Sequence, residues 1–362
     1  MGWILIKFKA LVWHIFIFII LPNLNHPTCF GQDQKAKLDY DSTYYTSYND
    51  DLHIRLYNVY KFNDLLIQDK NDRSNNIIYS PNGNLNVGFG FTYRGLGINI
   101  GLNLPAINND DDIYGKTTKL DMRSYMYGRK YAIDFGLQFY QGFYLKNTIK
   151  NIPPFPDTTP PQEIRGDMQV NTIGFTAFKI HNYEKFSFRA AFSQTEVQKK
   201  TAGSPIYGPY LNVLHFSADS ALIQDGEHGL ISNVKDGWYT STGFSGGYAF
   251  SIVLFKQFFI TGSAAFGYGL AIGNSTMENI EGNTTEVTIG GGIKVNARSA
   301  IGYNNDKTYV GLSIVLESYN INTPDDYLKL YMMGQFRFNI VRRFDWKISP
   351  FDWIMDRTPG FK

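Results

Sequence analysis

Long runs of alternating residues constrain this chain more than any other feature of its sequence. From residue 80 onwards, apolar side chains repeatedly take every second position, as in residues 84–94 and 96–104, and glycine or polar residues stand between them. A period of two is typical of β-strands with one apolar and one polar face. Turn residues separate the runs. The chain is therefore predicted to be all-β.

Alternation does not by itself separate a soluble sandwich from a membrane barrel, because the apolar face of a sandwich is its core. Three features favour an antiparallel transmembrane β-barrel. Many runs reach ten or more residues, as a tilted membrane-crossing strand requires. Tight turns, as at residues 94–95 and 256–257, alternate with longer polar loops, as at 105–115 and 146–167. The polar face also carries charges in mid-strand.

These mid-strand charges are predicted to line the interior of the barrel. The candidates are Arg94, Lys119, Asp121, Arg123, Asp134, Arg189, Lys294, Arg298, Glu317 and Arg337. Facing a lumen, they would either guide a polar solute or pair with one another and fill the interior. The sequence leaves both alternatives open.

The number of strands is less certain from the sequence than the architecture. Thirteen alternating segments lie near 52–62, 84–94, 96–104, 116–127, 131–145, 168–180, 185–196, 205–217, 236–254, 257–272, 285–303, 307–320 and 327–341. A single-chain bacterial barrel has an even number of strands. Placement by turn length conflicts between residues 168 and 217, so the surplus segment is expected there or at the first position. We predict about 12 strands, with 14 as the alternative.

Residues 1–31 are predicted to be a cleaved signal peptide. Lys7 and Lys9 form a positive region, residues 11–21 form an apolar core, and Gly31 ends a small-residue cleavage site,. The apolar core is short for a membrane-spanning helix, which needs about 20 residues. An uncleaved anchor is the alternative.

Cleavage would leave one barrel domain over residues 32–362, with a lead-in at 32–50 and a tail at 342–362. It would also remove Cys29, the only cysteine, and with it disulfide and thiolate chemistry,. The whole chain has 34 Lys and Arg against 32 Asp and Glu, and the two lysines of the signal peptide account for the difference. This balance argues against nucleic-acid binding, which demands a basic excess.

Three segments resemble a known family. The first runs from Ala190-Ala191-Phe192-Ser193-Gln194 to Lys200-Thr201-Ala202-Gly203-Ser204, the second is Asp41–Tyr45 leading to Leu52–Leu56, and the third is Tyr93–Gly97. They are similar to a domain-of-unknown-function family of outer-membrane barrels found mainly in Bacteroidetes. The resemblance spans nearly the whole mature chain. It implies a barrel in the outer membrane of a Gram-negative bacterium, and it carries over no catalytic residues.

Two groups of residues are candidates for the active site of a lipase-type enzyme. Ser204 would need Lys199 or Lys200 as its base, but a strand-end turn explains the same residues,. Of the histidines, His215 lies in a strand-like run, yet a catalytic triad is recognised only by geometry. The lipase-type hypothesis therefore has no motif to support it.

Two further segments suggest ligand chemistry only superficially. Residues 110–112 are three aspartates, without the spacing of a calcium-binding EF-hand loop,. Residues 290–292 are three glycines, without the Gly-Lys-Ser/Thr ending of a phosphate-binding loop,. They are expected to be a solvated loop and a strand bend, respectively.

The expected protein is an outer-membrane β-barrel with a structural or surface-binding role that the sequence does not specify. The alternatives are a channel for small polar solutes through the charged lumen and a membrane-embedded, lipid-modifying enzyme. No catalytic residue, cofactor or metal site is predicted. The expected partners are outer-membrane lipids and the barrel-assembly machinery.

Overall fold

A computed structural model of the chain describes residues 39–72, 76–94, 96–103, 108, 110–146, 163–223, 232–279, 282–346 and 348. Among these, Asp39–Phe344 form one compact unit. The predicted signal peptide, its Cys29 and most of the predicted tail lie outside the described residues. No helix in the described ranges is long and apolar enough to cross a bilayer.

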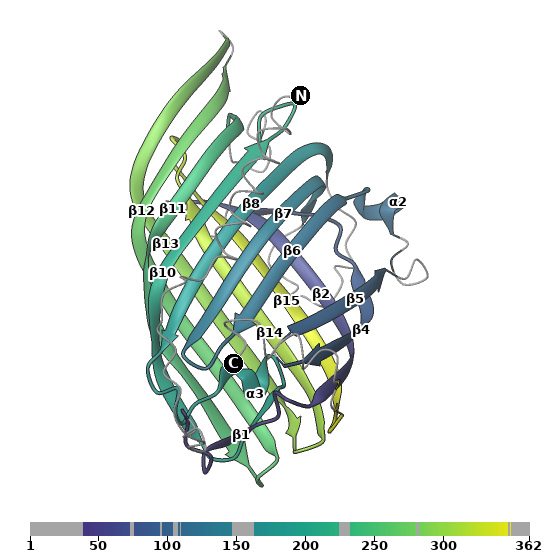
Figure 1. Cartoon of the computed structure of the whole chain (residues 1–362). Helices are drawn as coiled ribbons and strands as arrows, with labels where there is room; N and C mark the ends of the chain where they lie inside the picture. Colours follow the sequence, from purple (N-terminus) through teal and green to yellow (C-terminus); the bar gives the residue numbers. More distant parts are fainter. Residues whose placement is uncertain are drawn as a thin grey trace, which may run out of the picture. The chain divides into compact units, whose positions relative to one another are not determined.

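The unit consists almost entirely of strands (Figure 1), as the alternation predicted. They are β1 (Tyr45–Ser47), β2 (Leu52–Asp69), β3 (Asn76–Ser80), β4 (Leu85–Tyr93), β5 (Leu96–Asn103), β6 (Thr118–Tyr127), β7 (Tyr131–Lys146), β8 (Ile164–Ile180), β9 (Glu196–Gln198), β10 (Ala202–Ser217), β11 (Val234–Leu254), β12 (Phe258–Asn279), β13 (Gly282–Asn304), β14 (Thr308–Ile321) and β15 (Tyr327–Phe344). The helices α2 (Asp111–Tyr114) and α3 (Phe188–Ala191) have one turn each.

Ten of these strands close into an antiparallel ring. Its order is β15-β14-β13-β12-β11-β10-β8-β7-β3-β2, and the pairing of β2 with β15 closes it. That last pairing runs the whole length of both strands, from Leu52 opposite Phe344 to Asp69 opposite Tyr327. Closure gives each ring strand a neighbour on both sides over at least part of its length, which shields strand edges that a bilayer does not tolerate.

Three further strands attach to the ring, and this changes the predicted strand count. β4 pairs with β2, β5 pairs with β4, and β6 pairs with β7. The closed ring therefore has 10 strands with 3 more attached to it, and the predicted count of twelve is not confirmed. All the predicted segments except 185–196 coincide with a strand of this sheet, whereas the short β1, β3 and β9 had no clear alternation to reveal them.

Segment 185–196 was wrongly predicted as a strand of the wall. It lies in the connection between β8 and β10, which forms α3 and leads into β9. Phe186 and Phe188 do alternate, but both are buried against an interior cluster that includes Phe178 and Ile206. Because Ser187 Oγ accepts a hydrogen bond from Ala190 N, the segment turns into a helix instead,. We call residues 181–201 the plug.

The plug is held by the N-terminal lead-in and by the wall. β1 pairs with β9 in a separate two-stranded sheet. The wall donates hydrogen bonds to plug carbonyl groups, from Tyr309 Oη to Ala191 O (2.9 Å) and from Arg343 Nε to Gln194 O (3.1 Å). The plug lies at the same end as the tight turns at 128–130, 255–257 and 305–307, which we call the turn end. The opposite end is the loop end.

Apolar side chains fill the interior near the loop end. The cluster joins inward-facing residues of the strands to the connection after β10. Its members include Leu65, Ile67, Tyr79, Phe143, Met168, Leu214, Leu222, Ile223, Tyr319 and Tyr331. Tyr79 Oη donates to Leu222 O at 2.8 Å. Neither end of the described interior therefore presents an open passage.

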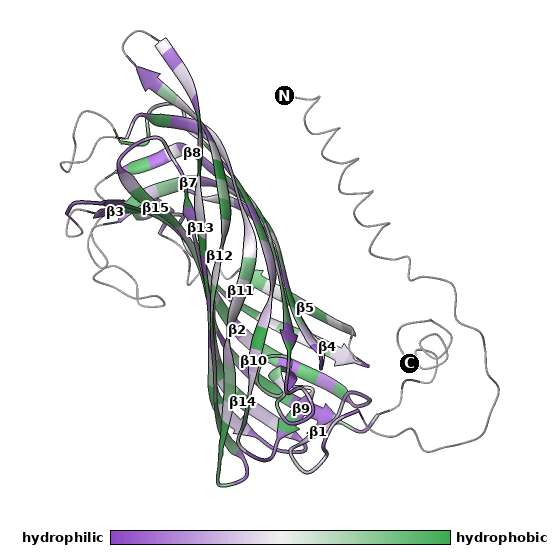
Figure 2. Ribbon diagram, turned by 90° about the vertical axis from the view of Figure 1, so that its left-hand side faces the viewer, coloured by the Kyte–Doolittle hydropathy of each residue, from purple (hydrophilic) through white to green (hydrophobic). Residues whose placement is uncertain are grey.

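The outer surface follows the predicted alternation. On β12, Ile260, Phe266 and Tyr268 are exposed, whereas the intervening Thr261 and Ala265 are buried. Figure 2 shows the resulting alternation of hydrophobic and hydrophilic residues along the strands. Large exposed apolar side chains recur around the barrel, as a lipid-facing surface requires,.

One place in the wall lacks strand pairing. The end of β2 near the loops pairs with β3, which in turn pairs with β7. Towards the turn end, β2 pairs with β4 instead, and β7 pairs with β6. The facing edges of β5 and β6 have no partner strand among the described residues. We call this interruption the seam; Figure 1 shows β5 at a different slope from β6.

The closed ring predicts that the folded protein resists detergent until it is heated. Because β2 pairs with β15 along its whole length and most of the wall is paired on both sides, unboiled protein should migrate differently from boiled protein in SDS gels,. It should also fractionate with outer membranes. Recovery in the soluble fraction without detergent would contradict a lipid-facing barrel.

Candidate functional site

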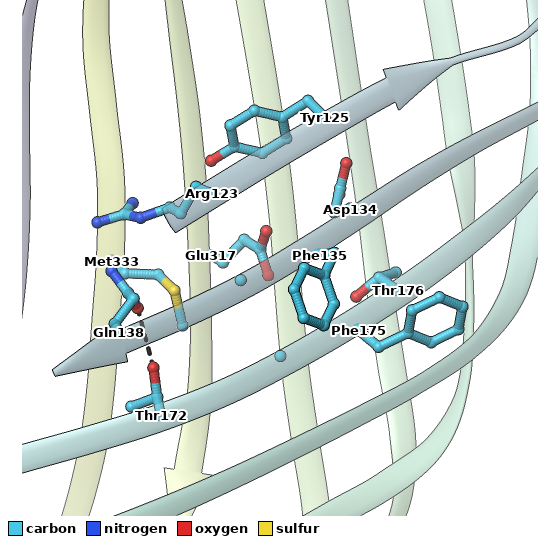
Figure 3. A pocket seen from close by; sticks show the side chains of 12 residues that line it. Arg123, Tyr125, Asp134, Phe135, Gln138, Thr172, Phe175, Thr176, Glu317 and Met333 are labelled. Carbon is cyan, nitrogen blue, oxygen red and sulfur yellow. Dashed lines mark hydrogen bonds between the residues drawn. The ribbon is translucent and has the colours of Figure 1, made fainter. Parts of the chain in front are cut away.

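Charged and polar side chains occupy the interior between the plug and the apolar cluster of the loop end. We call this layer the charged interior. Its residues come from β2, β6, β7, β13, β14 and β15. Figure 3 shows Arg123 of β6 and Asp134 of β7 on one side and Glu317 of β14 on the other. The alternation of each strand places them inside, because their outward neighbours are apolar,.

Asp121 of β6 is the centre of one network. Its carboxylate accepts from Lys61 Nζ at 3.0 Å and from Arg123 Nη2 at 2.9 Å. Gln138 Nε2 and Tyr140 Oη also donate to it, at 3.0 Å and 2.6 Å. Four donors compensate a buried carboxylate for its lost hydration. The network also joins β2 to β6 where the seam begins.

Arg123 extends this network across the interior. Its Nη1 donates to Gly334 O of β15 at 3.1 Å, and its Nη2 donates to Asn63 Oδ1 of β2 at 2.9 Å. One guanidinium thus links β6 with two strands beyond the seam. Because its fork of donors is planar and rigid, it holds these strands at a defined separation.

A second ion pair crosses the barrel. Arg298 of β13 donates to Asp134 of β7, and five steps separate these strands in either direction around the ring. The rings of Tyr127, Phe178 and Phe188 each lie 5.6 Å from the guanidinium carbon. Both charged groups are buried, so each depends on the other for compensation,.

A third pair lies on the far wall. Lys294 Nζ is 3.0 Å from Glu317 Oε2 and 3.0 Å from Asn212 Oδ1. Lys294 has no exposed surface. Its pairing with an acid and an amide therefore satisfies a cation that would otherwise be very costly to bury.

A small cavity lies among these networks. It has a volume of about 20 Å³, roughly the space of a single water molecule. Its lining includes Arg123, Asp134, Thr172 and Glu317, and Figure 3 shows these side chains converging from opposite walls. The charged interior is thus closely filled at this level.

Arg337 of β15 differs from these paired cations. Among the described residues no carboxylate pairs with it, and its guanidinium carbon lies 4.1 Å from the centre of the Tyr57 ring. Arg55 of β2 also lacks a carboxylate partner in the described part; it donates to Asn99 Oδ1 at 3.1 Å and to Ser193 O at 3.0 Å. The three central carboxylates are already used by other cations. The charged interior therefore has a positive excess.

The ten residues proposed from the sequence are not all in this layer. Asp121, Arg123, Asp134, Lys294, Arg298, Glu317 and Arg337 lie on inward-facing positions of it. Lys119 lies closer to the loop end, where its Nζ donates to Asn84 Oδ1 at 2.9 Å. Arg94 is outside it in the turn after β4, at φ 48°, and its Nε is 3.8 Å from Asp50 Oδ1. Arg189 belongs to the plug, because segment 185–196 is not in the wall.

Arg189 instead helps to bury an acid inside the plug. Glu196 is fully buried and lies 3.2 Å from Arg189 Nη1 and 3.4 Å from Arg129 Nε. Ser187 Oγ donates to the same carboxylate. Partial burial acts to lower the pKa of Arg129, but Glu196 and Asp39 outweigh it and raise that pKa. These contacts fix the plug to the turn between β6 and β7.

Sequence reasoning missed the contribution of β2. Arg55, Tyr57, Lys61 and Asn63 all face the interior from this strand. A continuous odd-numbered series through 52–62 was available as a signal. The intervening positions include Asn58 and Tyr60, so the apolar face of this strand is less clear than that of the others.

The enzyme hypotheses find no assembled site among the described residues. Ser204 Oγ is buried, donates to Pro205 O at 2.8 Å and accepts from Asn182 N at 2.8 Å. Lys199 and Lys200 donate elsewhere, to Ser42 O and Thr43 Oγ1. Ser204 lies within β10 opposite Ala249, so the prediction of a strand-end turn at this residue is wrong.

The histidine and aspartate candidates are likewise bound to other groups. His215 Nε2 is 3.2 Å from Asp236 Oδ2, and its ring stacks on Trp238 at 4.4 Å. Asn82 Nδ2 donates to Asp110 and Asp111, at 3.0 Å and 3.1 Å. In the described ranges no group of three or more His, Cys, Asp or Glu is placed to hold a metal ion.

Comparison with known proteins gives a family but no activity. A family model described as a domain of unknown function (DUF4421) matches residues 39–344. No curated protein is detectably similar to the chain.

Solved structures resemble the chain only distantly. Those similar to it include the translocator domain of the autotransporter NalP from Neisseria meningitidis (10% identity, 80% of this chain and 88% of that chain, TM-score 0.29), the P. putida toluene transporter TodX (7%, 82% and 90%, 0.22) and the outer membrane protein OprG from Pseudomonas aeruginosa (9%, 82% and 98%, 0.21). At these TM-scores they support no argument about binding or transport.

The ion pair between Asp134 and Arg298 is expected to be a major stabilising contact. Asp134→Asn leaves Arg298 buried without its counter-charge and should cost about 3–5 kcal/mol of unfolding free energy. The double variant Asp134→Leu with Arg298→Met should recover most of this loss, because no uncompensated charge is left. Urea unfolding in lipid vesicles measures both changes.

The matched control is Glu286→Gln, the same loss of charge on an exposed residue of β13. It should change stability by less than about 0.5 kcal/mol. Equal losses for Asp134→Asn and Glu286→Gln would show that the pair across the barrel does not stabilise it.

Proposed function

The chain belongs to the DUF4421 family, a domain family of unknown function, and we propose that it is an outer-membrane barrel that takes up a membrane-resident molecule through its side wall. In this proposal the barrel does not conduct solutes along its axis. The seam between β5 and β6 is the observation that carries it.

The arrangement of surfaces supports the outer-membrane location. Exposed apolar residues surround the barrel, and tight turns gather at one end with the plug. Short turns on the periplasmic side are usual for outer-membrane barrels. The turn end is accordingly assigned to the periplasm and the loop end to the cell surface.

Closure of the axis argues against the channel that the sequence left open as an alternative. The plug fills the turn end, the apolar cluster fills the loop end, and ion pairs cross the middle. A solute moving along the axis would have to displace all three layers. A side entrance avoids them, because the seam opens at the level of the charged interior.

The two faces of the seam fit an amphiphile. Outward residues on its edges are exposed and apolar, including Ile98, Ile100 and Leu102 on β5 and Leu120, Met122 and Met126 on β6. Inward residues on the same strands are polar or small, including Asn99 and Asp121. A molecule with an apolar tail and a polar head could keep its tail in the bilayer while its head enters the interior.

The unpaired strand edges at the seam destabilise the barrel in a membrane unless another group covers them. Backbone N–H and C=O groups facing hydrocarbon without partners cost several kcal/mol each. In the described part of the chain, β5 and β6 have no strand paired to their facing edges. We propose that these strands pair when the entrance is closed, which would give the 12-stranded wall expected from the sequence, and that they separate when a molecule enters.

The closed axis predicts that the purified protein does not form a steady pore. In planar bilayers it should produce no lasting single-channel steps, because the plug and the apolar cluster exclude hydrated ions. Dose-dependent, ohmic conductance would instead support the channel alternative.

Locking the seam should prevent loading. Leu102→Cys and Ser124→Cys place thiols on the outer faces of β5 and β6, and a bismaleimide can bridge them. The bridged protein is placed in nanodiscs that contain oleate, lysophosphatidate or oleyl alcohol, and bound amphiphile is measured by native mass spectrometry. The bridged protein should retain no more amphiphile than the background level of the measurement. Unbridged protein should retain it.

The control pair is Phe89→Cys with Ile100→Cys, which lie directly opposite each other on β4 and β5. Bridging them links strands that are already paired, so loading should be unaffected. If the locked seam loads as well as this control, the lateral entrance is refuted.

A further inference from the structure

We infer that the molecule taken up is a single-tailed amphiphile with an anionic head group, and that Arg337 holds this head group. The inference rests on the proposed lateral entrance, since it names what the entrance would admit. It is carried by the position of Arg337 relative to the seam and by unpartnered polar groups beside it.

Strand register connects Arg337 and its neighbours to the edge of the seam. Asn339 of β15 lies opposite Tyr57 of β2, Tyr57 lies opposite Gly88 of β4, and Gly88 lies opposite Gly101 of β5. These four residues form one row across the inner wall. The row ends at the unpaired edge of β5, and Arg337 lies one inward position away from Asn339 along β15.

Between Arg337 and the seam, glycines leave the inner face of the wall without side chains. A Cβ on Gly88 would lie 2.4 Å from Ile100 O and 2.5 Å from the Tyr57 ring. A side chain at Gly101 would meet the Tyr57 hydroxyl. The tyrosine ring therefore lies flat over this part of the wall, and Arg337 stacks on that ring at 4.1 Å. An apolar ring beside a cation suits the junction between a head group and a tail.

The positive charge of Arg337 favours a head group that is negatively charged. The carboxylates of the charged interior pair with Arg123, Arg298 and Lys294. Among the described residues, no carboxylate pairs with Arg337. Arg55 on the neighbouring strand is a second cation without a carboxylate partner among the described residues. Arg337 is half-buried and faces the interior, where a cation without a counter-charge is unfavourable,. An anion next to Arg337 would supply that counter-charge.

Asn339 supplies a second, independent indication of a ligand. Its side chain is 1% exposed and faces the interior, and neither its Oδ1 nor its Nδ2 has a partner among the described residues. Leaving a buried amide unsatisfied costs about 1–3 kcal/mol. A carboxylate or phosphate could accept from Asn339 Nδ2 and from the guanidinium of Arg337 together. Both head groups present the oxygens that a guanidinium binds.

The test measures binding of three probes with the same tail length in nonionic detergent. Oleate carries a carboxylate, an oleoyl lysophosphatidate carries a phosphate, and oleyl alcohol is neutral. At least one anion should bind more tightly than the alcohol, and the stronger anion identifies the head-group class. Arg337→Gln should weaken that anion roughly 10- to 100-fold, as expected for losing hydrogen bonds to a charged group. Binding of the alcohol should not change.

The matched control is Arg342→Gln on the same strand, where the side chain is exposed and donates to Thr308 Oγ1. It removes the same charge outside the interior and should leave every affinity unchanged. Heat-dependent gel migration verifies that each variant is folded. Arg337→Lys should restore part of the affinity, because the charge returns without the planar fork.

Two results overturn the inference: equal binding of oleyl alcohol and both anions, or anion binding that Arg337→Gln leaves intact. These differ from failure of the lateral entrance. If the locked seam still loads but Arg337→Gln weakens anion binding, the head-group site stands and the entrance is wrong. If the locked seam blocks loading but Arg337→Gln has no effect, the entrance stands and the anionic head group is wrong.

Discussion

The pairing of β2 with β15 is the interaction on which the rest of this structure depends. It turns a sheet with two free edges into a ring, and a bilayer offers no water to satisfy such edges,. Once the ring is closed, alternation sends apolar side chains to the lipid and everything else inwards. The interior must then satisfy its own polar groups, and the ion pairs and the plug follow from that requirement.

The interior meets this requirement unevenly. Asp134 with Arg298, and Glu317 with Lys294, compensate each other, and Tyr309 and Arg343 satisfy carbonyl groups of the plug. Buried polar atoms without a partner in the described residues occur on several strands, including both side-chain atoms of Asn296 on β13, and Arg337, Asn339 and the seam are three such places. These three lie on neighbouring strands at one side of the barrel. Buried polar groups without partners are costly, and strand register connects Arg337 and Asn339 to the edge of the seam.

Particular residues show why alternation predicted most of the wall but not its interior. On β12 every second residue faces lipid, so the pattern and the strand coincide. In segment 185–196 the same pattern arises because Phe186 and Phe188 pack inside the barrel, where an apolar core also rewards alternation. A period of two reports that one face is apolar and the other is not. It does not report whether the apolar face meets lipid or the interior.

Side-chain direction in a strand is a local property, so alternation alone accounts for the all-β class, the apolar outer face and the inward position of charges such as Asp121, Arg123 and Arg298. Only the tertiary structure decided that ten strands close the ring, that β5 and β6 lack a shared pairing, and that Asp134 meets Arg298. Those outcomes depend on which strands become neighbours or lie opposite one another. Register and closure join residues far apart in the chain, so no local pattern specifies them.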